Sequence, residues 1–318
     1  MKYTFLLPAF KATYFREALE SIKNQTYTDF KVVVSDDCSP EGTALKQIYD
    51  EVVDSRFTFR RNAENMGSKS LVSHWNLLVD LCDTDYLIMA SDDDVYEPIF
   101  LEEINRLVEK YPDCDLFRGR IRKISARGDM LFKDCLLDER TTHLEFMHHF
   151  FKGNIMKCIP QYVFKTSRLT EIGGFFSLPL AWGSDDATVL MMSENGCCHT
   201  PSVVFSFRLS GINISCMGNR RVDMEKSRAI YIYIEFLQNF LKSKENVNLS
   251  KYEKNLLSGI WQNLKYSTYV SDLWVGAELR NYHEMLPYYH KLDELHCFNG
   301  KLEKIHFFWN WLRAYKTR

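Results

Sequence analysis

Runs of apolar residues alternate with helical patterns along the first hundred positions. Tyr3–Leu7, Lys31–Ser35 and Tyr86–Ala90 are short and mainly apolar, as expected for buried strands. Pro8 ends the first run, and apolar residues recur at helical spacing over Phe15–Ile22. This β-α-β alternation predicts an α/β fold with a mainly parallel sheet and helices on both faces.

The rest of the chain divides at about residue 220. The pattern predicts helices at 42–53, 68–81, 101–111 and 187–192, and strands at 57–60, 115–118 and 161–165. From Val222 onward the pattern is helical, and no pair of acidic residues recurs at the end of a strand. We therefore expect an α/β domain over 1–220 and a helical C-terminal region over 221–318.

Composition excludes several classes of protein. The 40 Lys and Arg residues nearly balance the 42 Asp and Glu residues, and a net charge of −2 offers no general attraction for nucleic acid. The nine cysteines include no CxxC pair, which indicates neither a zinc site nor a disulfide framework and favours a reducing compartment. The N-terminus lacks the features of a signal peptide, and Ala229–Leu241 is shorter than the ~20 residues of a membrane span. A cytoplasmic protein is expected.

Three adjacent carboxylates, Asp92, Asp93 and Asp94, follow the strand Tyr86–Ala90. Adjacent carboxylates repel one another and are rarely gathered without a cation. Their oxygens suit Mg²⁺ or Mn²⁺, which complete their coordination with water and the phosphate oxygens of a substrate. A surface turn that caps the next helix is the alternative.

Asp36 and Asp37 follow a neighbouring strand and are also expected at the ligand-binding edge of the sheet. An ionised carboxylate there can accept a hydrogen bond from a nucleobase imide or from ribose hydroxyls, with Arg61 completing the base pocket. The backbone amides of Asn65 and Gly67, at a helix start, can face an anion. Each feature has a structural alternative: a turn and helix cap, a solvated arginine, and a plain Asn-Gly turn.

A third acidic pair, Asp185 and Asp186, follows an aromatic loop over 175–182. One of these carboxylates is a candidate general base for an acceptor hydroxyl, with the aromatic loop as a platform for a sugar. A helix N-cap is the alternative. Arg208, with Ser210, Asn213 and Ser215 nearby, is a candidate phosphate ligand.

The ordered set of segments Leu6–Phe10, Ala18–Phe30, Val34–Ser39, Asn65–Gly67 and Tyr86–Pro98 resembles the family 2 glycosyltransferases of GT-A fold, of the bacterial polysaccharide type. The resemblance covers about residues 1–210. It implies an inverting transferase that uses a nucleotide-diphospho-sugar and a divalent cation, Mn²⁺ or Mg²⁺. The acceptor it implies is a glycan or a lipid-linked saccharide in the synthesis of cell-surface polysaccharide.

The resemblance also implies roles for individual residues, by position. Pro8 and Phe10 border the nucleotide, and Asp37 contacts the base. Among the three adjacent carboxylates, Asp92 and Asp93 contact ribose or diphosphate, and either Asp93 or Asp94 dominates ligation of the metal. For the base we prefer Asp186 over Asp185, because the expected helix over 187–192 begins directly after Asp186.

Two other functions stay open. A nucleotidyltransferase shares the α/β core and the metal carboxylates, but its phosphate loop is normally rich in glycine, and Pro8–Thr13 contains none. A non-catalytic sugar-nucleotide binder would hold the donor with Asp185 and Asp186 too far from the anomeric carbon. The sequence identifies neither the sugar nor the nucleotide.

The final stretch, Lys301–Arg318, is basic and rich in aromatic residues. An amphipathic helix of this composition suits a membrane surface, where a lipid-linked acceptor would lie, and this would make the protein peripheral at the inner face of the cell membrane. A helix docked on its own domain, or a contact in a homodimer, is the alternative.

Overall fold

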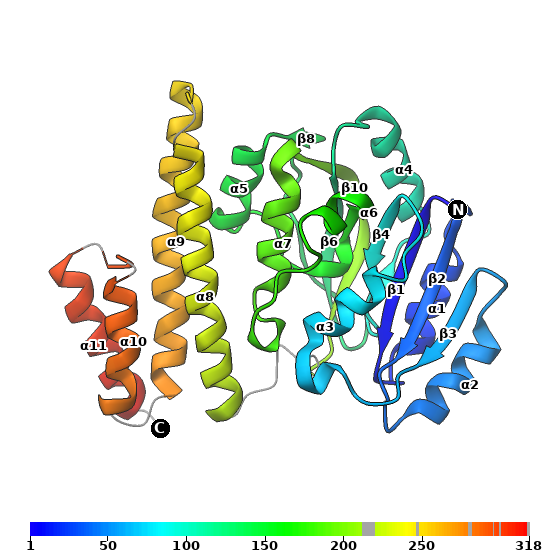
Figure 1. The fold of residues 1–318 in the computed structure, drawn as a ribbon, viewed down its shortest axis with the longest axis horizontal. Coiled ribbons are helices and arrows are strands. Elements are labelled where there is room, and N and C mark those ends of the chain that lie inside the picture. The colour runs from blue at the N-terminus through cyan, green and yellow to red at the C-terminus, as the bar shows by residue number, and fades with distance from the viewer. Residues whose placement is uncertain (212–219, 246–247, 279–281, 295, 299, 317–318) are drawn as a thin grey trace. The chain divides into compact units, whose positions relative to one another are not determined.

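The computed structural model describes residues 1–318 apart from 212–219, 246–247, 279–281, 295, 299 and 317–318 (Figure 1). The chain divides into two compact units. The first unit is Met1–Phe146, Asn154–Ser177 and Ser184–Cys216, and the second is Met147–Gly153, Leu178–Gly183 and Met217–Arg318. The functions expected for 1–220 and for 221–318 stay predictions.

The strands of the first unit form one sheet, and helices follow most of them. The strands are β1 (Tyr3–Ala9), β2 (Phe30–Asp36), β3 (Phe57–Arg61), β4 (Tyr86–Met89), β5 (Val95–Tyr96), β6 (Leu116–Ser125), β7 (Met130–Lys133), β8 (Arg140–Thr141), β9 (Tyr162–Lys165) and β10 (Cys197–Leu209). The α-helices of the chain are α1 (Phe15–Lys23), α2 (Gly42–Val52), α3 (Gly67–Val79), α4 (Phe100–Lys110), α5 (His143–Lys152), α6 (Thr166–Glu171), α7 (Ser184–Met192), α8 (Arg220–Glu245), α9 (Lys251–Glu278), α10 (Tyr282–Glu294) and α11 (Lys301–Lys316).

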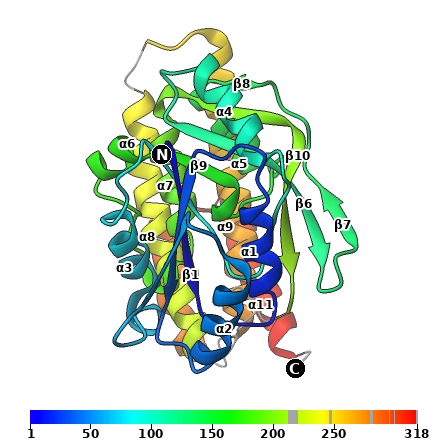
Figure 2. The same cartoon turned by 90° about the vertical axis from the view of Figure 1, so that its right-hand side faces the viewer.

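The sheet has the order β3-β2-β1-β4-β9-β6-β10-β5, with β7 paired to β6 and β8 to β10. From β3 to β4 all pairings are parallel, and Leu6 of β1 lies in register with Val33 of β2 and Met89 of β4. Helices α1 and α3 lie on opposite sides of β1 (Figure 2). The predicted α/β class is confirmed, and the burial of β1 on both faces explains its continuous apolar run.

Beyond β4 the sheet is mixed, and here the sequence-based prediction was incomplete. Strand β10, the longest in the sheet, was not predicted, because Pro201 and several polar residues interrupt its apolar pattern. Its register with β6 shifts between His199 and Val203, which accommodates the proline within the strand. Helix α7 begins at Ser184 instead of residue 187, so Asp185 and Asp186 lie in its first turn.

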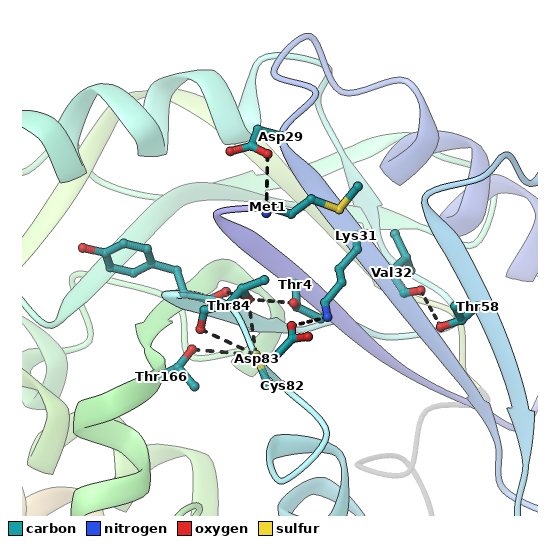
Figure 3. Close-up of polar contacts among 11 residues, drawn as sticks. Met1, Thr4, Asp29, Lys31, Val32, Thr58, Cys82, Asp83, Thr84 and Thr166 are labelled. Atoms are coloured by element: carbon teal, nitrogen blue, oxygen red, sulfur yellow. Dashed lines mark hydrogen bonds and ion pairs between the residues drawn. The ribbon is translucent and has the colours of Figure 1, made fainter.

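Side chains stabilise the amino-terminal edge of the parallel strands (Figure 3). The hydroxyls of Thr4 and Thr84 are 2.7 Å apart, and Cys82 Sγ lies 3.7 Å from Thr166 Oγ1. Lys31 pairs with Asp83 at the same edge. These contacts involve the chain's own groups, whereas the acidic clusters lie at the opposite, carboxyl-terminal edge.

The second unit contains α8 to α11 and has a core of its own. Residues of three helices and of the turn before α11 make this core: Ile234, Met285, Leu292, Cys297, Phe307 and Trp311. Among the helices that the structure describes, none is both long enough and apolar enough to cross a membrane.

One buried ion pair supports the first unit. Arg118 of β6 and Asp134 pair at 1% and 0% side-chain exposure, and Asp134 Oδ1 also accepts a hydrogen bond from the Met156 amide at 2.7 Å. The substitution Asp134→Ala would leave the guanidinium buried without its counter-charge. We expect it to lower the free energy of unfolding in urea by about 3–5 kcal/mol.

Asp113→Ala is the matched control for this prediction. Asp113 pairs with Arg140 at 2.6 Å, but its side chain is 64% exposed, so the loss should be about 0–1 kcal/mol. Similar losses in the two variants would show that the burial of the Arg118–Asp134 pair does not matter.

Candidate active site

The carboxyl ends of β1, β2 and β4 meet at one edge of the sheet. Ala9 lies in register with Asp36, and the Asp37 amide donates to the Ala9 carbonyl at 3.0 Å. The Ala90 amide donates to the Leu6 carbonyl at 2.8 Å, which sets the start of the Asp92–Asp94 turn beside β1. The structure therefore brings the first two acidic clusters together, as the parallel pairing requires.

Asp92 holds the loop after β1. Its Oδ2 accepts hydrogen bonds from the amides of Phe10 and Lys11, each at 2.8 Å. Pro8 is half-buried within β1, and the Phe10 side chain is 36% exposed, so the loop presents an aromatic ring beside the acidic turn. Asp92 thus positions the segment that was expected to border the nucleotide.

Arg208, at the end of β10, bonds to the Asp94 side chain and to the main chain of Asp93. The Arg208 amide donates to Asp94 Oδ1 at 2.8 Å, and Arg208 Nε donates to the Asp93 carbonyl at 2.9 Å. Asp94 Oδ2 accepts from Ser91 Oγ at 2.5 Å. The Arg208 guanidinium is 2% exposed and pairs with Glu17 of α1 at 2.5 Å.

These contacts engage the guanidinium that was expected to hold a phosphate, and the phosphate contact stays a prediction. Its guanidinium is buried and bonded to the chain's own carbonyl and carboxylate groups, so we assign it a positioning role for the Asp92–Asp94 turn. Ser210 directly follows β10, and Asn213 and Ser215 lie outside the described residues.

The three adjacent carboxylates differ in exposure: Asp94 is buried, and Asp92 and Asp93 are half-buried. Burial raises the pKa of Asp94 to about 8, and the charge of Asp93 adds to the shift. Burial and the neighbouring Asp92 raise the pKa of Asp93 to about 6. Burial also raises the pKa of Asp92, against the opposing effect of its two amide donors. The charges of Lys11 and Arg208 lower the pKa of Asp93 but do not cancel the effect of burial.

The residues present fit a divalent cation that is only partly coordinated by protein. Carboxylate oxygens are hard ligands, and each carries a second lone pair beyond the hydrogen bonds described above. Within the described part of the chain, no three His, Cys, Asp or Glu side chains converge as a preformed metal cage. One or two carboxylates completed by phosphate oxygens match the coordination that Mg²⁺ usually adopts.

Asp37 lies at the expected base-binding position, but its oxygens are already bonded. Oδ1 accepts from Asn62 Nδ2 at 2.8 Å and from the Met66 amide at 2.9 Å, and Oδ2 accepts from the Gly67 amide at 2.7 Å. A Cβ at Gly67 would lie 2.9 Å from Asp37 Oδ2, so only glycine permits this approach.

The amides of this loop were expected to face a ligand. The Gly67 N–H donates to Asp37 here, and the expected ligand contact stays a prediction. Asn65 is half-buried in the same loop. The sequence analysis missed His74 of α3. Its Nδ1 lies 3.7 Å from Asp37 Oδ2, and its Nε2 lies 3.2 Å from Asn62 Nδ2. Burial lowers the pKa of His74, so the ring is neutral at pH 7.

Asp36 and Arg61 pair with each other at the end of β2. Asp36 is fully buried, its Oδ2 pairs with Arg61 Nη1, and its Oδ1 accepts from the Ser39 amide at 2.8 Å. Arg61 Nη2 donates to the Ser39 carbonyl at 3.1 Å. The Asp36–Arg61 pair fixes the turn between β2 and α2, and the contact expected between these two side chains and the nucleotide stays a prediction.

The third acidic pair lies near the first turn of α7, and its two members differ. Asp186 Oδ2 is 3.3 Å from Lys157 Nζ, and its side chain is 19% exposed. Burial raises the pKa of Asp185 to about 7, with the charge of Asp186 as the second cause. Near neutral pH, Asp185 therefore exchanges between its acid and base forms.

A buried thiol links this pair to the adjacent carboxylates. Burial raises the pKa of Cys158 well above its ordinary value, and the charges of Asp94, Asp185 and Asp93 each raise it further. These carboxylates therefore lie close enough to act on one sulfur, although they are about ninety positions apart in the chain. No sequence signal marked Cys158 or Lys157 as part of this neighbourhood.

The aromatic loop expected to stack on a sugar is divided between the units. Asn76 of α3 anchors its first part, accepting from the Phe175 amide at 2.7 Å and donating to the Phe175 carbonyl at 3.2 Å. Trp182 belongs to the second unit, where Lys226 Nζ lies 4.4 Å from its ring centroid. A stacking role for Trp182 stays a prediction.

Residues 4–158 match the family model described as glycosyl transferase family 2. An uncharacterized glycosyltransferase of Methanocaldococcus jannaschii is 29% identical over 146 residues, covering 45% of this chain and 48% of the relative. An uncharacterized glycosyltransferase of Haemophilus influenzae is 32% identical over 97 residues, covering 30% and 31%. The chain thus spans about half or less of the length of these curated relatives.

Two solved structures show the same fold. S. aureus TarS 1–349 in complex with UDP-GlcNAc aligns with a TM-score of 0.57 at 15% identity, covering 100% of this chain and 91% of that one. The mannosyltransferase PcManGT from Pyrobaculum calidifontis, in complex with GDP-Man and Mn²⁺, aligns with a TM-score of 0.56 at 14% identity, covering 99% and 86%.

The bonding of Asp37 gives a direct test of the site. Asp37→Asn would place an amide donor against a backbone N–H of the loop over 62–67. We expect the free energy of unfolding to fall by about 1–3 kcal/mol, and hydrogen exchange of the Met66 and Gly67 amides to accelerate. Glu64→Gln is the control, since Glu64 is 65% exposed and should change stability by no more than about 0.5 kcal/mol. Unchanged exchange at Gly67 would show that this contact does not hold the loop.

Proposed function

Residues 4–158 belong to glycosyl transferase family 2 and form part of a GT-A fold, and from this premise we propose that the protein transfers a sugar from a nucleotide-diphospho-sugar to a hydroxyl acceptor. One observation supports this most strongly. The charges of Asp93, Asp94 and Asp185 all act on the Cys158 thiol, so a cation site and a candidate base lie in one neighbourhood. A transferase needs both beside the anomeric carbon.

Asp93 and Asp94 are the proposed cation ligands. When bound, Mn²⁺ or Mg²⁺ would act as a Lewis acid on the leaving diphosphate. Asp92 and Arg208 hold the ligand turn in place from its two sides, through the loop after β1 and the end of β10. The protein's own contribution is therefore a preorganised turn of carboxylates, and a bound cation would favour the ionised forms of Asp93 and Asp94, whose pKa values are raised mainly by burial.

Asp185 is the proposed general base, in preference to Asp186. Lys157 Nζ lies 3.3 Å from Asp186 Oδ2, whereas the pKa of Asp185, at about 7, is close to the operating pH that suits proton transfer. Asp185 would take the proton from the acceptor hydroxyl as the oxygen attacks the anomeric carbon, from the face opposite the leaving diphosphate. This displacement inverts the anomeric configuration.

The nucleobase is proposed to bind beside Asp37, with Phe10 and Asn65 at the rim of its site. A carboxylate selects an N–H donor, which uracil and thymine offer as an imide and guanine offers at N1 and its amino group. The nucleotides in the neighbours' structures, UDP-GlcNAc in TarS and GDP-Man in the mannosyltransferase, support this pair of candidates. The proposed acceptor is a saccharide or a lipid-linked saccharide, at the cytoplasmic face of the membrane in polysaccharide synthesis.

A thermal-shift panel of UDP-, GDP- and dTDP-sugars, with and without Mn²⁺, tests the donor. A ligand at about 100 times its Kd stabilises the folded state by about 2.7 kcal/mol. We expect one nucleotide class to raise the melting temperature, and to do so strongly only with Mn²⁺. Asp94→Asn should remove the Mn²⁺-dependent part, while Asp113→Asn at an exposed position should not.

Product assays with the same nucleotides separate the two other functions. Release of pyrophosphate from a nucleoside triphosphate would indicate a nucleotidyltransferase. Donor binding without hydrolysis or transfer, across a set of saccharide acceptors, would indicate a sugar-nucleotide binder. No shift with any sugar nucleotide would contradict the proposed function itself.

Turnover of the identified donor tests the base. We expect Asp185→Asn to lower kcat by ~10² to 10⁴-fold while the donor-induced thermal shift persists, and Asp186→Asn to have the smaller effect. In the wild type the rate should fall as the pH drops through about 7, because protonated Asp185 cannot accept the acceptor's proton. Full activity of Asp185→Asn together with an inactive Asp186→Asn would reverse the assignment.

A further inference from the structure

Helix α11 presents two apolar faces, and only one of them is packed. Phe307 and Trp311, at 1% and 7% exposure, lie in the core of the second unit with Met285 and Leu292. Phe308 stacks beside them, 4.7 Å from the Tyr289 ring. This face of α11 therefore packs on the core of its own unit, as in the docked helix that the sequence analysis gave as the alternative.

The opposite face is apolar and exposed, and we call it the α11 stripe. Its residues follow at intervals of three and four positions, which places them along one side of the helix. They are Leu302, Ile305, Trp309 and Leu312, at 78%, 51%, 59% and 39% exposure. Single exposed apolar residues are ordinary, but four large ones on one helix face need a partner.

Basic residues border the stripe. Lys301 and Arg313 are exposed on α11, as is His306. Lys304 pairs with Asp293 of α10, and Glu303 is half-buried. The basic residues Lys301, Lys304 and Arg313 outnumber the acidic residues Glu303 and Asp293 by one, so this group carries a small positive charge that complements an anionic surface.

We propose that the α11 stripe lies in the interface of an anionic membrane, with Trp309 at its centre and the basic residues against the lipid headgroups. This arrangement of aliphatic, aromatic and basic residues is that of helices that lie on membranes. A second copy of the chain fits less well. A two-fold contact through the stripe would bring the basic borders of the two copies toward each other.

The membrane contact adds to the proposed function, but the test of the membrane contact does not depend on that function. If the protein transfers sugar, a helix on the membrane surface brings the site to a lipid-linked acceptor, and this part of the inference rests on the proposed function. Binding to lipid itself requires no catalysis. A failure to bind lipid is therefore distinguishable from a failure to transfer sugar.

Co-sedimentation of the full chain with vesicles tests the proposal. We expect binding to vesicles of two parts phosphatidylcholine to one part phosphatidylglycerol, and much weaker binding to pure phosphatidylcholine. Ile305→Glu with Trp309→Glu should lower the partition coefficient by about tenfold or more, since two apolar side chains no longer enter the interface. Lys301→Glu with His306→Glu leaves the stripe intact and should abolish the preference for the anionic vesicles.

Met130→Glu with Phe132→Glu is the matched control. These side chains of β7, in the first unit, are 65% and 51% exposed, so the control adds the same charge at comparable exposure outside the α11 stripe, and it should bind as the wild type does. The proposal is overturned if the wild type does not bind anionic vesicles, or if the stripe variant binds equally well. It is also overturned if light scattering without lipid shows a dimer that only the stripe variant dissociates. Far-UV circular dichroism and the melting temperature without ligand check that each variant is folded.

Discussion

Buried carboxylates at one edge of the sheet must each find hydrogen-bond donors, and the loops of the site are arranged to supply them. Asp92 binds the loop after β1, Asp37 binds the start of α3, Asp36 binds the turn before α2, and Asp94 binds the end of β10. In each case the donors include a backbone N–H from another part of the turn or chain. The acidic residues therefore hold the local backbone together before any ligand is considered, because an unsatisfied buried carboxylate costs several kcal/mol.

This constraint explains how the same residues can be structural and functional. A carboxylate that accepts one or two amides keeps lone pairs for a further partner, so its structural role does not exhaust its capacity. Asp36 departs from this pattern, because Arg61 neutralises it within the chain. The Asp93 and Asp94 carboxylates, whose pKa values are raised, are the ones that a cation would relieve. The carboxylate whose charge is compensated within the chain thus supports the fold, and the two with raised pKa values form the proposed cation site.

Much of the fold follows from the sequence, because β1, β2 and β4 are buried strands and leave mainly apolar runs. β10 could not be predicted from the sequence, because its proline and polar residues interrupt the apolar pattern of a strand. Helix α7 begins earlier than its apolar residues indicate. The acidic clusters were visible as motifs. Their internal partners were not, because the pairing of Asp36 with Arg61 and of Arg208 with Glu17 depends on side-chain directions that spacing does not encode.

The bonding of Asp37 has a consequence for selectivity. Asp37 is already bonded to the amides of Met66 and Gly67, and its oxygens keep lone pairs for a further donor. At the proposed nucleotide site, a base that offers an N–H could share the carboxylate with these amides. A base that offers an acceptor instead would place a lone pair against the carboxylate, at the cost of an unmet hydrogen bond. Under the proposal, Asp37 would therefore contribute more to discrimination between bases than to affinity.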